Sequence, residues 1–94
     1  MADRNGYNPS IIHDGDCYYC GRNETVRHEI FQGKNRTVSK FYGCWLTLCP
    51  ACHMMVHNDS EISTGLKKVA QTKAMSRYGW SKKDFINVFG KNYI

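Results

Sequence analysis

The pattern of hydrophobic and polar positions predicts two β-strands in the first half of the chain. Residues 25–31, TVRHEIF, are rich in the β-branched and aromatic side chains that strands favour. Residues 44–49, CWLTLC, form a second short apolar run. Residues 1–16 are polar and rich in Asn, Gly and Asp, which predicts a flexible, mostly irregular arm. Scattered glycine, asparagine and serine predict a loop over residues 32–43, between the two strands.

The second half of the chain predicts helices. Pro50 suits the first position of a helix, where its missing N–H costs nothing, so a helix carrying ACHMMVH is expected after the second strand. A longer helix is predicted from Ser60, as its N-cap, to Gly79, which ends it. Its apolar residues recur at close to the helical period of 3.6. They are Ile62, Leu66, Val69, Ala70 and Tyr78.

The end of the chain predicts one more helix and carries the excess positive charge. Ser81 begins this helix with Asp84 as a variant capping box, and Gly90 ends it. Residues 61–94 hold seven Lys/Arg against two acidic residues, a net charge of +5, whereas residues 1–60 hold six of each sign. Such a basic segment suits a partner with a phosphate backbone. The alternative is a helix face that only keeps the protein in solution.

Length and cysteine content narrow the class of protein. The 94 residues allow one domain at most, which we assign to residues 17–94, and a chain this short gains much stability from a bound metal. No apolar run approaches the roughly 20 residues that span a bilayer, and the N-terminus lacks the apolar region of a secretory signal. Five cysteines in such a chain favour metal binding in a reducing compartment over disulfides. We therefore expect a cytoplasmic protein with no membrane partner.

Four of the five cysteines form two Cys-x-x-Cys pairs, 28 residues apart. The two-residue spacing lets both thiolates of a pair reach one ion, and two pairs close a tetrahedral four-sulfur site of the kind that suits Zn²⁺. The sequence therefore predicts a structural zinc held by Cys17, Cys20, Cys49 and Cys52. The alternative, two chance pairs of buried cysteines, is disfavoured because each pair lies beside a turn-forming Gly or Pro. Cys44 is left over and is predicted to be a small buried hydrophobic residue.

Three histidines suggest a second metal site. His53 and His57 have the i, i+4 spacing that places both imidazoles on one helix face, and His28 lies on the first predicted strand. Two helical histidines and a third ligand from elsewhere make an open site, which keeps positions for water or phosphate. Two alternatives stay open: His53 or His57 replaces a cysteine in a Cys₃His zinc site, or these histidines are ordinary surface residues.

The stretch from residue 27 to residue 57, RHEIFQGKNRTVSKFYGCWLTLCPACHMMVH, resembles the HNH nuclease motif, also called the ββα-metal finger. It is similar in particular to small phage-type members, whose second strand runs into Leu-Cys-Pro-x-Cys-His. The matching residues are His28, Glu29, Ile30, Phe31, Gly33, Asn35, Arg36, Ser39, Tyr42, Gly43, Leu48, Cys49, Pro50, Cys52, His53 and His57. The tail KDFINVFGKNYI is also similar to the ends of such phage proteins, so the resemblance covers roughly residues 17–94.

The resemblance implies an α+β fold in which two strands and a helix hold one divalent cation, here joined to a four-cysteine zinc site and followed by C-terminal helices. It also implies DNA as the partner, hydrolysis of DNA phosphodiester bonds as the reaction, and a phage-associated role in a bacterial or phage-infected host cell. In such nucleases the metal binds the scissile phosphate and stabilises the leaving 3′ oxygen, while a base on the first strand activates water. Phosphodiester hydrolysis needs these two elements on physical grounds as well.

Within the resemblance, the family's adjacent ligand and base fall on His28 and Glu29. Aligned on the following Ile-Phe pair, His28 takes the ligand place with His53 and His57, and Glu29 takes the place of the base, which is usually His in the family. The shifted register would make His28 the base and leave Arg27 as ligand, which arginine cannot be at any working pH. The motif's Asn is commonly found just before the second strand. Here Asn35 lies in the right loop but further upstream, as a candidate orienter of the base or backbone.

Two groups of basic residues are candidates for DNA binding. One surrounds the motif together with aromatic residues, namely Arg27, Lys34, Arg36, Lys40, Tyr42 and Trp45, and Arg36 has the fork that clamps a phosphate. The other lies on the long helix and comprises Lys67, Lys68 and Lys73. For any one of these residues, a simple exposed charge is the alternative.

The sequence thus favours a metal-dependent HNH-type endonuclease, acting as a monomer or homodimer. The catalytic cation would be Mg²⁺, Mn²⁺, Ni²⁺ or Zn²⁺, with three imidazoles favouring the softer ions. The alternative is a non-catalytic zinc module that binds nucleic acid or a protein, in which Glu29 is a surface residue of the strand.

Overall fold

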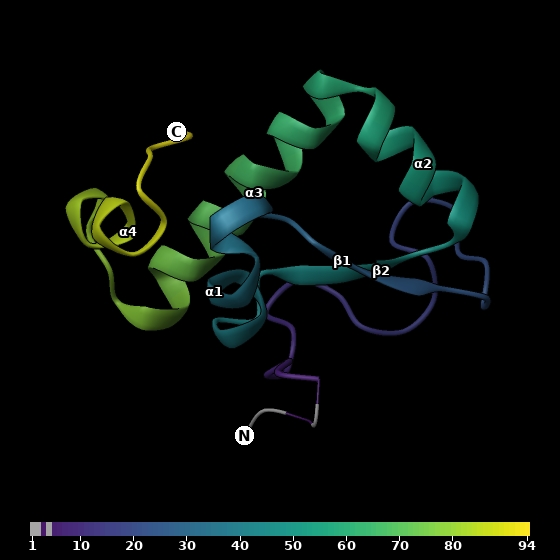
Figure 1. The fold of residues 1–94 in the computed structure, drawn as a ribbon, viewed down its shortest axis with the longest axis horizontal. Coiled ribbons are helices and arrows are strands. Elements are labelled where there is room, and N and C mark those ends of the chain that lie inside the picture. The colour runs from purple at the N-terminus through teal and green to yellow at the C-terminus, as the bar shows by residue number, and fades with distance from the viewer. Residues whose placement is uncertain (1–2, 4) are drawn as a thin grey trace.

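Two short antiparallel strands lie at the centre of the computed structural model, which describes residue 3 and residues 5–94 (Figure 1). Strand β1 spans Val26–Glu29 and strand β2 spans Trp45–Leu48. Their register sets His28 opposite Leu46 and Glu29 opposite Trp45. Four α-helices complete this small α+β fold in the described part of the chain. Both predicted strands are therefore present, each shortened at its ends.

The N-terminal segment lies along β2 and covers one face of the sheet. Ile11 donates its backbone N–H to the carbonyl of Gly43, and His13 forms an isolated parallel bridge with Leu46. On the same side the indole of Trp45 donates to the carbonyl of Asn8. Because this segment covers one face of β2 and the helices cover the other, all four residues of β2 are buried.

The loop predicted over residues 32–43 is wrong, since most of it is helical. A 3₁₀ turn spans Gly33–Asn35, and helix α1 follows over Arg36–Phe41. The reason lies in Ser39, which is fully buried: its hydroxyl donates to the carbonyl of Cys44 and accepts from the N–H of Phe31. A serine anchored in this way packs inside a helix, so it does not interrupt one.

The helices of the second half follow the predicted order. Helix α2 spans Pro50–Asn58, α3 spans Ser60–Tyr78 and α4 spans Lys82–Phe89. In Figure 1, α2 and α3 form an inverted V above the sheet. The N-cap of α3 is Asp59 and not the predicted Ser60, because the Asp59 carboxylate accepts from the backbone N–H groups of residues 61 and 62. None of the helices described here is long and apolar enough to cross a membrane.

Helix α4 begins and ends as predicted. Ser81 and Asp84 form the capping box, and Gly90 ends the helix in the left-handed conformation. Its buried face packs on Phe31, two residues after the end of β1: the ring of Phe89 lies 4.4 Å from that of Phe31, centroid to centroid. This aromatic contact joins the C-terminal helices to the sheet.

Gly43, just before β2, is required by the approach of the N-terminal segment. Its φ is +73°, and an added Cβ would lie 2.3 Å from the carbonyl oxygen of Pro9. We expect Gly43→Ala to lower the free energy of unfolding by about 2 kcal/mol or more, because strain and a backbone clash add. The matched control is Gly65→Ala inside α3, where an added Cβ meets nothing. It should raise stability by up to about 1 kcal/mol. Equal urea midpoints for the two variants would contradict this packing of the segment on the sheet.

Candidate metal centres

The four predicted cysteines come together at one end of the sheet. Their sulfur atoms all lie within 4.8 Å of one another, and the Sγ atoms of Cys20 and Cys49 are 3.5 Å apart. Sulfurs on one tetrahedral zinc ion are separated by about 3.8 Å, given a Zn–S distance near 2.3 Å. The four-cysteine cluster can therefore hold a zinc ion, as predicted.

Backbone hydrogen bonds hold each cysteine pair in place. The first pair lies in a tight turn, in which the N–H of Gly21 donates to the carbonyl of Cys17. The second pair begins α2: Cys49 is the N-cap, and its sulfur accepts from the backbone N–H of Cys52. That N–H lowers the pKa of the Cys49 thiol, which favours the thiolate that binds a metal.

Cys44 lies apart from the cluster, in the core. It is fully buried, and burial raises the pKa of its thiol to about 12, so it stays protonated. The prediction that Cys44 is a small buried hydrophobic residue is confirmed.

The three predicted histidines also meet. His28 comes from β1, and His53 and His57 come from successive turns of α2, with one ligand nitrogen from each within 4.8 Å of the others. The Nε2 atoms of His53 and His57 are 3.0 Å apart. His28 faces α2 because it shares the covered face of the sheet with its partner Leu46. The distance between the ligand atoms suits a single cation bound by three imidazoles.

The chemistry of His28 fits such a cation. Its side chain is only 4% exposed, and its Nδ1 atom has no hydrogen-bond partner among the described residues. Burial, aided by the charges of His53 and His57, lowers the pKa of His28 to about 4, so the imidazole is neutral at pH 7. Neutral imidazole is the form that binds metals.

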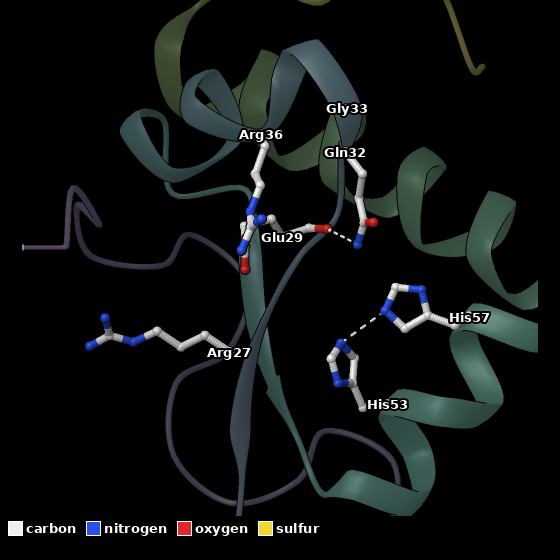
Figure 2. A pocket seen from close by; sticks show the side chains of 7 residues that line it. All are labelled: Arg27, Glu29, Gln32, Gly33, Arg36, His53 and His57. Carbon is white, nitrogen blue, oxygen red and sulfur yellow. Dashed lines mark hydrogen bonds and ion pairs between the residues drawn. The ribbon is translucent and has the colours of Figure 1, made fainter.

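A cavity of about 380 Å³ opens beside these histidines (Figure 2). It is lined by Arg27, Glu29, Gln32, Gly33, Arg36, His53 and His57. Figure 2 shows His53 and His57 projecting from α2 towards Gln32 and Glu29, while Arg27 points to the other side of the strand. Glu29, the last residue of β1, also lines this cavity, although successive strand residues point to opposite faces and its neighbour His28 faces α2. The cavity thus combines histidines, one carboxylate and guanidinium groups.

The carboxylate of Glu29 is held from two sides. The hydroxyl of Tyr7 donates to one oxygen at 2.8 Å, and Nε of Arg36 donates to the other at 2.5 Å. Burial alone would raise the pKa of Glu29, but the hydrogen bonds from Tyr7 and Arg36 outweigh it and keep the pKa below its ordinary value. Glu29 is therefore ionised at neutral pH and fixed in orientation. Each oxygen keeps a further acceptor site.

The two arginines of the cavity differ in how they are held. Arg27 donates to Asp3 at 2.7 Å, and its guanidinium lies 4.4 Å from the centroid of the Tyr7 ring. Arg36 makes its contact with Glu29 through Nε, and its side chain is 64% exposed. The terminal nitrogens of Arg36 make no hydrogen bond with the described residues, so Arg36 is the better placed of the two for a phosphate.

The predicted residues outside the cavity are placed as follows. Asn35 donates its side-chain amide to the carbonyl of Phe89 at 2.7 Å, so it ties the turn before α1 to the end of α4. Lys67 lies beside His28 and His57, Lys68 lines a different hollow, and Lys73 faces the N-terminal segment. The three lysines therefore do not share one surface, because successive helical residues point in different directions.

Two residues of the site were not predicted from the sequence. Tyr7 lies in the polar segment before the sheet, and no periodicity there indicates its contact with Glu29, 22 positions later. Gln32 follows the first strand directly, and its amide donates to the carbonyl of Glu29 at 3.1 Å. Its position next to the motif was the one available signal.

Comparison with the models of known protein families, with curated proteins and with solved structures gave no match to this chain. The chemistry of the two clusters and of the cavity beside them is therefore what indicates a function.

The four-cysteine cluster predicts about one tightly bound zinc per chain, worth on the order of 10 kcal/mol of folding free energy. Cys17→Ala should therefore lose the zinc and the cooperative thermal transition. The matched control is Cys44→Ala, which removes an equally buried thiol outside the cluster. It should keep the full zinc content by atomic emission spectroscopy. A Cys17→Ala protein that melts like the parent would show that the cluster is not structural.

Proposed function

We propose that the protein is a metal-dependent endonuclease of the HNH type, which hydrolyses phosphodiester bonds in DNA. One observation carries this proposal: three imidazoles lie close enough to hold one cation, and two of them, His53 and His57, line the same cavity as an oriented carboxylate and an exposed arginine. A cation and a base are the two elements that phosphodiester hydrolysis requires.

The order of the elements agrees with a ββα-metal finger. His28 is supplied by β1, β2 pairs with β1, and α2 follows β2 directly with His53 and His57. The helix of the proposed finger begins at the second cysteine pair. In this proposal the four-cysteine zinc is structural and the three histidines hold a separate catalytic cation.

The cation, Glu29 and Arg36 would each have a separate role in the reaction. The cation, when bound, would act as a Lewis acid that stabilises negative charge on the phosphate and on the leaving 3′ oxygen. Glu29, ionised and oriented by Tyr7 and Arg36, would take the proton of the attacking water. The exposed end of Arg36 would bind a non-bridging phosphate oxygen.

His28 is better suited to be a ligand than a base. Its imidazole meets His53 and His57 at ring-centroid distances of 5.1 and 5.2 Å, and its low pKa makes it a poor proton acceptor at pH 7. Glu29 is the remaining proton acceptor on the first strand. Its lowered pKa makes it a weak base as well, so most of the rate acceleration would come from charge stabilisation.

The test is nicking of supercoiled plasmid with Mg²⁺, Mn²⁺, Ni²⁺ or Zn²⁺ added to the zinc-loaded protein. We expect cleavage by the parent and a cleavage rate lower by on the order of 100-fold or more for His53→Ala. Mutating even the hydrogen-bond partners of metal ligands typically lowers metal affinity or activity by about 10–100-fold. The matched control is Met54→Ala on the same helix, whose side chain is 63% exposed. It should cleave like the parent.

Cleavage that survives in His53→Ala would contradict the proposed site. If the pure parent cleaves with none of these ions yet binds DNA or a protein, the alternative of a non-catalytic zinc module would replace the nuclease.

Glu29→Gln tests the role of the carboxylate. Glutamine keeps the shape but cannot accept a proton, so cleavage should fall by about 100-fold or more while the second cation still binds, measured by calorimetry. Glu24→Gln, the same change at an exposed position before β1, is the control. Normal cleavage by Glu29→Gln, together with metal retained in His28→Ala, would give the role of base to His28.

A further inference from the structure

A second, smaller cavity adjoins the proposed active site on the side of α3. Its volume is about 140 Å³, well above the ~10–15 Å³ that one water molecule needs. It is lined by His28, Ile30, Gln32, Val56, His57, Ser63 and Lys67. Gln32 and His57 also line the larger cavity, so the two cavities lie on either side of these side chains.

The polar lining of this smaller cavity suits an anion. Lys67 supplies a positive charge, Ser63 and Gln32 supply hydrogen-bond donors, and no carboxylate lies among the lining residues described. In the described part of the chain Lys67 forms no salt bridge. A partly buried lysine without a carboxylate partner is costly to desolvate, and a bound anion compensates that cost.

Lys67 is held in place by the C-terminal tail. Its Nζ lies 5.6 Å from the centroid of the Tyr93 ring, a cation–π distance. The tail is fixed by Gln71 of α3, which is fully buried and whose side-chain oxygen accepts from the backbone N–H of Tyr93 at 2.7 Å. The ammonium group is therefore positioned beside the cavity before any ligand binds.

We propose that Lys67 and Ser63 bind the DNA phosphate next to the one that is cleaved. This proposal rests on the proposed nuclease function, in which the scissile phosphate occupies the larger cavity. A DNA strand carries one phosphate per nucleotide, so a strand in the larger cavity brings a neighbouring phosphate towards His57 and α3. The backbone would then run from Arg36 past the histidines to Lys67.

Lys68 provides the matched control for Lys67. It carries the same charge one position further along α3 but lines a different hollow, which it shares with Glu61. Replacing either lysine by alanine removes one positive charge from the same helix. Long-range attraction to DNA falls equally in both variants, whereas a local phosphate contact is lost in Lys67→Ala alone.

The experiment compares the two variants on DNA and on bis(p-nitrophenyl) phosphate, which contains a single phosphate. For Lys67→Ala we expect kcat/KM on DNA, mainly through KM, to fall about tenfold more than on the one-phosphate substrate, the size of one charge-assisted hydrogen bond. For Lys68→Ala the two losses should agree within about twofold. Equal behaviour of the variants would overturn the subsite. An equal loss on both substrates for Lys67→Ala would assign Lys67 to the scissile phosphate and overturn the adjacent-phosphate proposal.

Binding of a labelled oligonucleotide, followed by fluorescence anisotropy, separates this proposal from the nuclease itself. Zinc content and thermal melting confirm that both variants are folded. If the parent binds DNA without cleaving it, a weaker affinity of Lys67→Ala relative to Lys68→Ala upholds the phosphate site although the nuclease proposal fails. Equal affinities of the two variants overturn it.

Discussion

The four-cysteine cluster is the constraint on which the rest of the structure depends. Cys49 is both a member of the cluster and the N-cap of α2, and His53 follows Cys52 directly. A metal that joins the four sulfurs therefore ties the first turn of α2 to the turn of Cys17 and Cys20 before β1. In a chain of 94 residues the hydrophobic core alone gives little stability. A metal held by this cluster would stabilise the fold and would also fix the position of His53 and His57 relative to β1.

The candidate metal ligand and the carboxylate come from adjacent residues of β1 that point in different directions. His28 points towards α2 and meets the two helical histidines, whereas Glu29 ends the strand and is held by Tyr7 and Arg36. Successive residues of a strand point to opposite sides, so a ligand and a carboxylate serve one site only where the strand ends. The N-terminal segment is thus part of the site, because it supplies the hydroxyl that orients Glu29.

The sequence predicted the metal-ligand clusters better than it predicted their surroundings. Cysteine pairs at two-residue spacing, and histidines at i, i+4, have few geometric solutions, so both clusters are found with the predicted members. The helix over residues 36–41 was missed because its buried serine depends on partners in Phe31 and Cys44, which local patterns do not show. Tyr7 was missed for the same reason. Charge alone places the three lysines of α3 in one DNA-binding group. Because successive residues of a helix point in different directions, only Lys67 lies beside the histidines.

The measurement that tests the central claim most directly is X-ray absorption on protein that holds one equivalent of zinc and one of nickel. We predict that the zinc edge shows four sulfur neighbours and that the nickel edge shows only nitrogen and oxygen neighbours, with imidazole scattering that His53→Ala removes. Sulfur around the nickel, or a protein that binds no second ion, would contradict the separation of one structural and one catalytic metal site.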